Sequence, residues 1–203
     1  MSIKLASLTE VKAMLNATDS FPDDTVLTTI LEKVSAAIES YLGRELEDTG
    51  SDATMYFSGD GRRRIFAVRR FPGVTVTSVH DSLDRSYGSG DLISSDDYAV
   101  HADEGLVEME YPLQPGVRNV RIVYSGGYEA DEETGILPVP DPIKHACILQ
   151  AAEVYRRRES MTETSVSNDL GTMSMPVTFD LMDLTPGVKR TLDPFKCYPM
   201  GAM

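Results

Sequence analysis

The hydrophobic pattern of this 203-residue chain changes its period twice, and that change limits the folds the chain can adopt. Between Asp23 and Gly43, apolar residues recur every three or four positions, which predicts an amphipathic helix. From about residue 54 to residue 128 the period becomes two, which is typical of strands. The helical period then returns between Asp141 and Arg158. The sequence therefore predicts an α+β fold, in which a small α-helical bundle carries a β-rich insertion and an extended C-terminal arm.

Local signals mark the ends of the predicted helices. Ser7 and Glu10 form a capping-box pattern ahead of a short first helix. Gly43 is a natural end for the second helix, and Asp141 can cap the third. We expect Arg156–Arg158 to complement the negative end of that third helix, whose small residues favour close packing against the second.

Candidate strands fill the period-two region and are separated by turn residues. Gly59, Gly73 and Gly105 lie in three of these turns, so we expect the strands to pair in an antiparallel manner. The candidate strands are residues 55–57, 64–71, 74–80, 98–101, 106–111 and 117–124.

The region after residue 158 is predicted to form the arm. A polar stretch precedes alternating apolar residues between Met173 and Leu181, and Pro176 restricts such a strand to a sheet edge. We interpret it as a strand that completes a sheet in another subunit, or alternatively pairs within its own chain. A short helix follows and ends near Phe195. The predicted domains are a helical core (1–48 and 139–158), a β-rich insertion (49–138) and a C-terminal arm (159–203).

Charge and composition exclude several classes of protein. With 19 basic and 32 acidic residues the net charge is -13, which argues against a protein that grips nucleic acid. No run of about 18 apolar residues is present, so we expect no membrane-spanning helix. We also expect no secretory signal, a soluble chain, and Cys147 and Cys197 as free thiols in a reducing cytoplasm.

The sequence offers little support for catalysis. His80, His101 and His145 show none of the spacings that fix metal ligands, although His80 and His101 on adjacent strands could form a metal or general-base site. Asp131 to Glu133 fit a solvated loop better than a calcium site. We expect no enzyme activity, no cofactor and no metal.

Separated segments of the chain, in their order and spacing, resemble the bacteriophage head-to-tail connector or adaptor proteins that form a ring beneath the portal. Together these segments span nearly the whole chain. They are Leu8 to Lys12, Asp23 to Arg44, Arg121 to Tyr128, Val139 to Arg158 and Val188 to Phe195.

The resemblance implies a structural virion protein at the head-to-tail interface, assembled in the host cytoplasm, in a bacteriophage or a gene transfer agent. It implies a homo-oligomeric ring of twelve subunits that binds the portal protein and a stopper or tail-terminator protein. DNA would pass through the channel as non-sticking cargo, because acidic walls repel phosphates. The alternatives are a stopper or tail-completion ring one layer further from the head, or a β-rich ligand-binding module.

We expect the arginine clusters at 62–64, 69–70 and 156–158 to face protein neighbours, because arginine forms bidentate contacts with carboxylates and is common at interface hot spots. The resemblance adds the arm and the terminal helix as portal contacts. The predicted portal and subunit interface consists of Arg156, Arg157, Arg158, Met173, Met175, Val177, Phe179, Leu181, Val188, Leu192 and Phe195.

Overall fold

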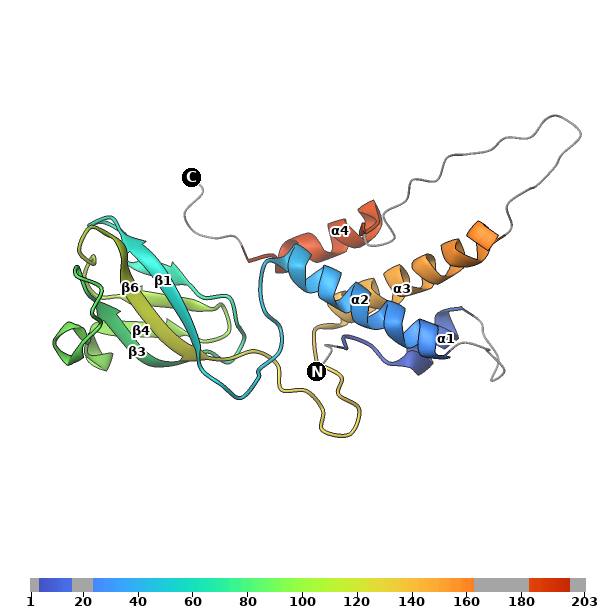
Figure 1. Ribbon diagram of the computed structural model, residues 1–203, viewed down its shortest axis with the longest axis horizontal. Helices are drawn as coiled ribbons and strands as arrows, with labels where there is room; N and C mark the ends of the chain where they lie inside the picture. The colour runs from blue at the N-terminus through green and yellow to red at the C-terminus, as the bar shows by residue number, and fades with distance from the viewer. Residues whose placement is uncertain (1–3, 16–23, 163–182, 198–203) are drawn as a thin grey trace, which may run out of the picture. The chain divides into compact units, whose positions relative to one another are not determined.

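The computed structural model describes residues 4–15, 24–162 and 183–197, which form two compact units (Figure 1). The helical unit contains the residues up to Leu42 together with Asp131–Lys196. The β unit contains Gly43–Ala130 together with Cys197. The chain is thus α+β, as predicted, with helices and antiparallel sheets in separate units.

The helical unit is built from four α-helices. They are α1 (Leu8–Met14), α2 (Asp24–Leu42), α3 (Asp141–Thr162) and α4 (Pro186–Leu192), followed by the 3-10 turn η3 (Asp193–Phe195). α3 packs against each of the other three helices. The predicted capping box at α1 is present, with the Ser7 hydroxyl accepting from the Glu10 amide and the Glu10 carboxylate accepting from the Ser7 amide.

The interface between α2 and α3 explains why small residues recur along α3. Ala146 and Ala151 are fully buried, as is Ile38 on α2. Ser35 satisfies its hydroxyl within α2 by donating to the Leu31 carbonyl oxygen at 2.8 Å, and its Oγ lies 3.7 Å from the Cys147 Sγ. Neither group therefore leaves an unpaired polar atom in the helical core.

The C-terminal end of α3 corrects one expectation from the sequence. The helix continues to Thr162, so Arg156–Arg158 do not occupy its last turn and do not complement its negative end. Three of the four added residues are polar, and two of the four, Glu159 and Met161, are good helix formers. The polar residues of this stretch had suggested a loop, but a helix accommodates them as well.

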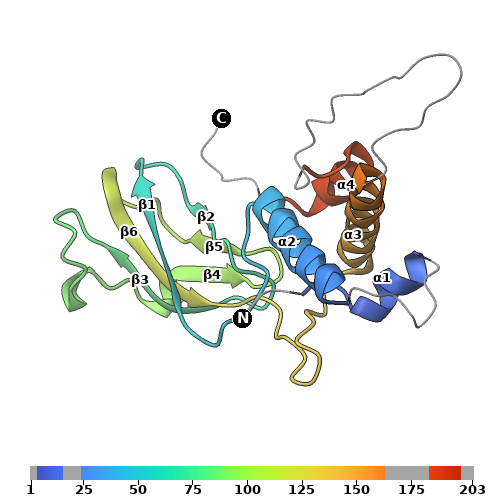
Figure 2. The ribbon, with the colours of Figure 1, turned by 45° about the vertical axis from the view of Figure 1, so that its right-hand side comes forward.

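The β unit contains two three-stranded antiparallel sheets, which confirms the predicted pairing direction (Figure 2). One sheet has the order β1 (Ala53–Gly59), β6 (Gly116–Ser125) and β3 (Thr75–Asp81). The other has the order β2 (Ile65–Ala67), β5 (Leu106–Met109) and β4 (Tyr98–His101). Among the described strands, sequence neighbours pair only in the β4–β5 hairpin. The turn at Gly59–Gly61 therefore carries the chain from one sheet to the other.

Both sheets contribute to one hydrophobic core. Phe66 and Val107 come from the second sheet, and Val120 and Ile122 from the first, and all four are at most 1% exposed. The ring of Phe57 meets that of Phe66 edge-on, with centroids 5.3 Å apart. Within the described parts of the chain, no helix is long and apolar enough to cross a membrane.

Candidate functional site

The three histidines lie apart and do not converge on one site. His80 is in β3 and His101 is in β4, so they belong to different sheets, and His145 is exposed on α3. Burial and the neighbouring Arg121 guanidinium lower the pKa of His80, which favours its neutral form. In the described ranges, no group of three or more His, Cys, Asp or Glu side chains is placed to hold a metal ion.

The predicted arginine interface on α3 differs from residue to residue. Arg156 is exposed, and its Nη2 donates to the carbonyl oxygen of Met14 at the end of α1, at 3.3 Å. Arg157 Nε donates to Glu153 Oε1 at 2.6 Å in an i,i+4 ion pair. The side chain of Arg158 lies outside the described residues, as do the predicted interface residues between Met173 and Leu181.

The predicted interface residues on α4 divide between core and surface. Val188 and Leu192 are buried, at 4% and 0% exposed, so they anchor α4 in its own helical unit. Phe195 is partly exposed. Gln150 on α3 supports this arrangement, since its amide donates to the Asp183 carbonyl oxygen and accepts from the Thr185 amide. The sequence had not indicated the role of Gln150.

Contacts from Tyr41 hold the residues that follow α4. Tyr41 at the end of α2 donates to Asp193 Oδ1 at 2.7 Å, and Lys196 Nζ lies 3.7 Å from the Tyr41 ring centroid. The Tyr41 hydrogen bond, with help from Lys196, lowers the pKa of the Asp193 carboxyl. No local sequence pattern links these residues, because 152 positions separate Tyr41 from Asp193.

The outer face of the β1-β6-β3 sheet carries a stacked group of tyrosines and arginines. The rings of Tyr56 and Tyr87 are 5.5 Å apart, the Arg118 guanidinium lies over Tyr56, and the Arg121 guanidinium lies over Tyr87. Tyr87 and Arg118 both adopt positive φ, 50° and 53°, which is unusual for residues other than glycine. Such strain is found preferentially at functional sites, so this face is a candidate contact surface. Sequence reasoning missed it.

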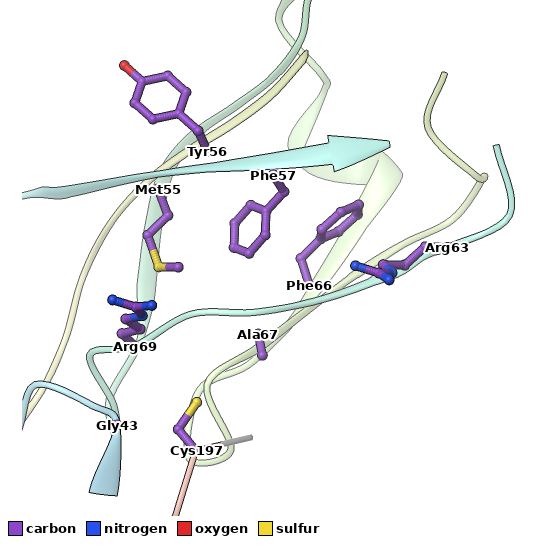
Figure 3. Close-up of a pocket in the computed structure, with 9 residues that line it drawn as sticks. All are labelled: Gly43, Met55, Tyr56, Phe57, Arg63, Phe66, Ala67, Arg69 and Cys197. Atoms are coloured by element: carbon purple, nitrogen blue, oxygen red, sulfur yellow. The ribbon is translucent and has the colours of Figure 1, made fainter. Parts of the chain in front are cut away.

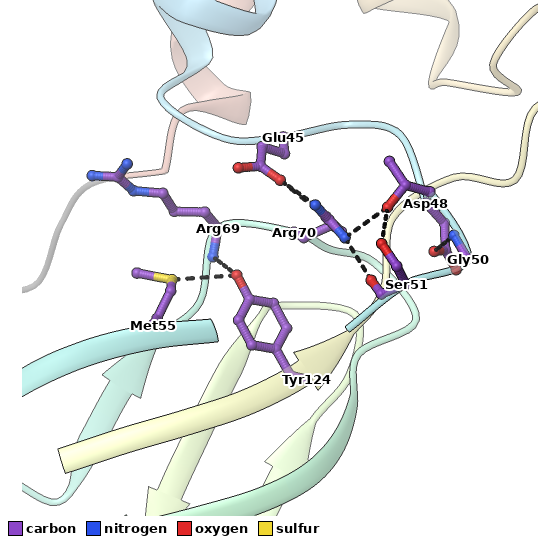
Figure 4. Close-up of polar contacts among 9 residues, drawn as sticks. Glu45, Asp48, Gly50, Ser51, Met55, Arg69, Arg70 and Tyr124 are labelled. Atoms are coloured by element: carbon purple, nitrogen blue, oxygen red, sulfur yellow. Dashed lines mark hydrogen bonds and ion pairs between the residues drawn. The ribbon is translucent and has the colours of Figure 1, made fainter. Parts of the chain in front are cut away.

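The buried Arg70 holds residues 45–51, the segment that enters the β unit (Figure 4). Arg70 Nε and Nη2 donate to Glu45 Oε2 at 3.0 and 2.6 Å, while Nη1 donates to Thr49 Oγ1 and the Ser51 carbonyl oxygen. Arg70 is therefore engaged by its own chain, and the prediction that this cluster faces protein neighbours is wrong for this residue.

A pocket of about 350 Å³ opens in the β unit (Figure 3). Met55 and Phe57 of β1 point into it toward Phe66, whereas Tyr56 points to the other side of the strand. The remaining lining residues surround these side chains. They are Gly43, Arg63, Ala67, Arg69 and Cys197.

Arg63 and Arg69 give the pocket positive charge. Among the described residues, neither guanidinium has an ion-pair partner. Burial raises the pKa of the Cys197 thiol, and this effect outweighs the opposite effect of the nearby Arg44 and Arg69. The pocket combines an apolar base with two positive charges, which suits an apolar segment that carries a carboxylate.

The N-terminal part of the chain matches a known protein family. Residues 5–58, which include α1, α2 and most of β1, match the family described as Phage gp6-like head-tail connector protein. This match confirms the resemblance drawn from the sequence. No curated protein sequence matches the chain.

Two solved structures have the same fold over nearly the whole chain. A chain in the neck of an empty gene transfer agent (GTA) particle, computed with C6 symmetry, matches with a TM-score of 0.56 and 17% identity. A chain in the virion of a native GTA particle matches with a TM-score of 0.54 and 16% identity. Each alignment covers 97% of this chain and 91% of the other.

Proposed function

We propose that this chain, a structural head-tail connector protein and not an enzyme, is a subunit of the adaptor ring next to the portal of a phage-like particle. One observation carries the proposal: the whole fold, including the β unit, is that of a chain in a GTA neck. A neck treated with six-fold symmetry is compatible with twelve copies per ring, which is the number we propose.

The charge of the chain suits a DNA channel. The net charge is -13, and the loop from Glu129 to Glu133 presents exposed carboxylates, as does the β4–β5 turn at Asp103 and Glu104. Fixed negative charge repels the phosphate backbone, so a genome can slide past without binding. We propose that part of this acidic surface lines the channel.

The portal contact is proposed to involve the α3 arginines and the C-terminal arm. Arg156 is exposed and its guanidinium has only one neutral acceptor among the described residues, so most of its donors remain available. Arginine donors of this kind pair well with carboxylates of a partner. A stopper or tail-terminator protein is the partner proposed for the opposite side of the ring.

Electron microscopy of the purified chain mixed with purified portal protein tests this proposal. Rings that dock on the portal are expected for the unchanged chain, with loss of docking in the double variant Arg156→Ala and Arg157→Ala. The matched control, Arg62→Ala with Arg64→Ala, removes two exposed arginines from the β unit and is expected to dock normally.

Three outcomes would each exclude one part of the proposal. Normal docking by the α3 double variant would exclude the arginine contact. Rings that ignore the portal but bind a preformed adaptor–portal complex would identify a stopper one layer further from the head. A stable monomer that binds neither would remove the ring itself.

A further inference from the structure

The two sheets of the β unit are joined along one side and open along the other. On the joined side, next to β3 and β4, the amide of Val74 donates to the Ala102 carbonyl oxygen at 3.2 Å. On the open side lie β1 and β2, each the outer strand of its sheet. Among the described strands, β1 pairs with β6 alone. One edge of β1 therefore has no strand partner, and unpaired edges favour the addition of another strand.

The 350 Å³ pocket lies along this opening, which we name the β1–β2 seam and define by Met55, Phe57, Arg63, Phe66 and Arg69. Met55 and Phe57 are two positions apart and point to the same side of β1 (Figure 3). A strand added along this edge would alternate in the same way, so that every second side chain enters the seam. The seam thus selects an extended segment with apolar residues at alternate positions.

We propose that the β1–β2 seam accepts residues 173–181 of a second copy of this chain as a strand added to the free edge of β1. The proposal rests on the ring assembly proposed above. The alternation of this segment predicts that, in an extended conformation, one side would carry Met173, Met175, Val177, Phe179 and Leu181.

Length, charge and backbone chemistry agree with this occupant. A nine-residue strand extends about 30 Å, enough to run the full length of the seven-residue β1. Asp180 is the one charged residue of the segment, and it would alternate to the side opposite the apolar residues, so the strand brings no charge into the apolar seam. Pro176 has no amide hydrogen, which fits a strand that hydrogen-bonds on one side only.

The donor and acceptor surfaces differ, and this favours a neighbouring copy as the source of the strand. When one surface of a subunit binds a different surface of the next, the contact repeats and generates a ring if the rotation closes. Strand donation would therefore link every subunit of the ring to its neighbour. Donation within one chain would leave the ring without this contact.

Cysteine cross-linking between two differently tagged chains tests the proposal. The donor carries Val177→Cys together with Cys197→Ser, and the acceptor keeps Cys197, which lines the seam. A mild oxidant such as diamide takes two electrons and two protons from the thiol pair to form the disulfide. Cys147 is fully buried in both chains and does not compete.

The expected result is a donor–acceptor disulfide on a non-reducing gel, at least about ten times more abundant than with the control donor Ser167→Cys and Cys197→Ser. Ser167 lies before the alternating segment. Equal cross-linking by both donors would overturn the proposal. So would a disulfide that forms only when Val177→Cys and Cys197 share one chain.

Ring formation is scored separately, by electron microscopy of the same samples under reducing conditions. Rings without the specific cross-link would exclude strand donation and leave the adaptor ring intact. Absence of rings together with absence of the cross-link would refute both proposals.

Discussion

Replacing Arg70 is expected to release the segment that enters the β unit. Arg70 is 9% exposed and binds residues far from it in the sequence: Glu45 lies 25 positions away and Ser51 lies 19 positions away (Figure 4). Arg70→Met keeps much of the apolar stem and removes all of these donors. Glu45→Gln removes only the negative charge and keeps an acceptor oxygen. Comparing the two variants separates the hydrogen bonds from the ion pair.

The structure predicts unequal costs. The Glu45 side chain is 55% exposed, so its ion pair is screened by water and contributes at most about 0.5 kcal/mol. The bonds from Arg70 Nη1 to Thr49 Oγ1 and to the Ser51 carbonyl oxygen contribute about 1 kcal/mol each. We therefore expect about 2 kcal/mol for Arg70→Met and about 0.5 kcal/mol for Glu45→Gln.

Hydrogen exchange of single amides measures the loss of local stability in each variant at the segment that Arg70 holds. The amide of Glu45 donates to the Arg69 carbonyl oxygen, and the amides of Asp48 and Tyr128 join the same segment to the end of the β unit. Exchange at these amides should accelerate about 30-fold in Arg70→Met and about 2-fold in Glu45→Gln, since 1.4 kcal/mol is a factor of ten. The amides of α2 should be unchanged. Equal acceleration by both variants would refute the reasoning, because it would assign the stabilisation to the charge.

Three further predictions concern the two cores and the thiols. Leu192→Ala, at a fully buried position, should destabilise the helical unit by about 2–5 kcal/mol, measured by hydrogen exchange in α3 and α4. Burial, with help from Arg121, lowers the pKa of His80 below its ordinary 6.5, so the unfolded chain binds more protons between the two values. Stability should fall as pH drops below about 6.5, and urea midpoints should lose this dependence in His80→Gln. Burial raises the pKa of Cys147 to about 12, so iodoacetamide should label Cys197 in the folded chain and Cys147 only after unfolding, as mass spectrometry would detect.

Local patterns predicted the elements well because their signals lie within a few residues of one another. The capping box at Ser7 and Glu10 spans one helical turn, and the structure contains both of its hydrogen bonds. The period-two region predicted strands and their antiparallel direction. The end of α3 was missed because polar residues are common both in helices and in loops, and nothing in the sequence at Glu159 decides between the two.

Contacts between distant residues could not be predicted in the same way. The sequence contains the turn at Gly59–Gly61, but it does not show that β1 pairs with β6 across 60 positions. The candidate seam depends on that pairing, because only then do β1 and β2 become outer strands. The stacked face at Tyr56 and Tyr87 likewise requires the fold to bring the strands β1 and β6 and one loop together.

Arginines that are neighbours in the sequence of the β unit make different contacts in the structure. Arg70 forms an ion pair with Glu45. The guanidinium of Arg44 lies over the ring of Phe71, and that of Arg121 lies over the ring of Tyr87. These positive charges are matched or stacked within the unit, whereas Arg69, next to Arg70 in sequence, lines the seam without an ion-pair partner among the described residues. Internal use of positive charge leaves the solvent-facing surface more negative than an even distribution would. An acidic exterior with a few such arginines supports the channel role proposed above, since carboxylates would repel the genome and the remaining guanidinium groups could bind neighbouring proteins.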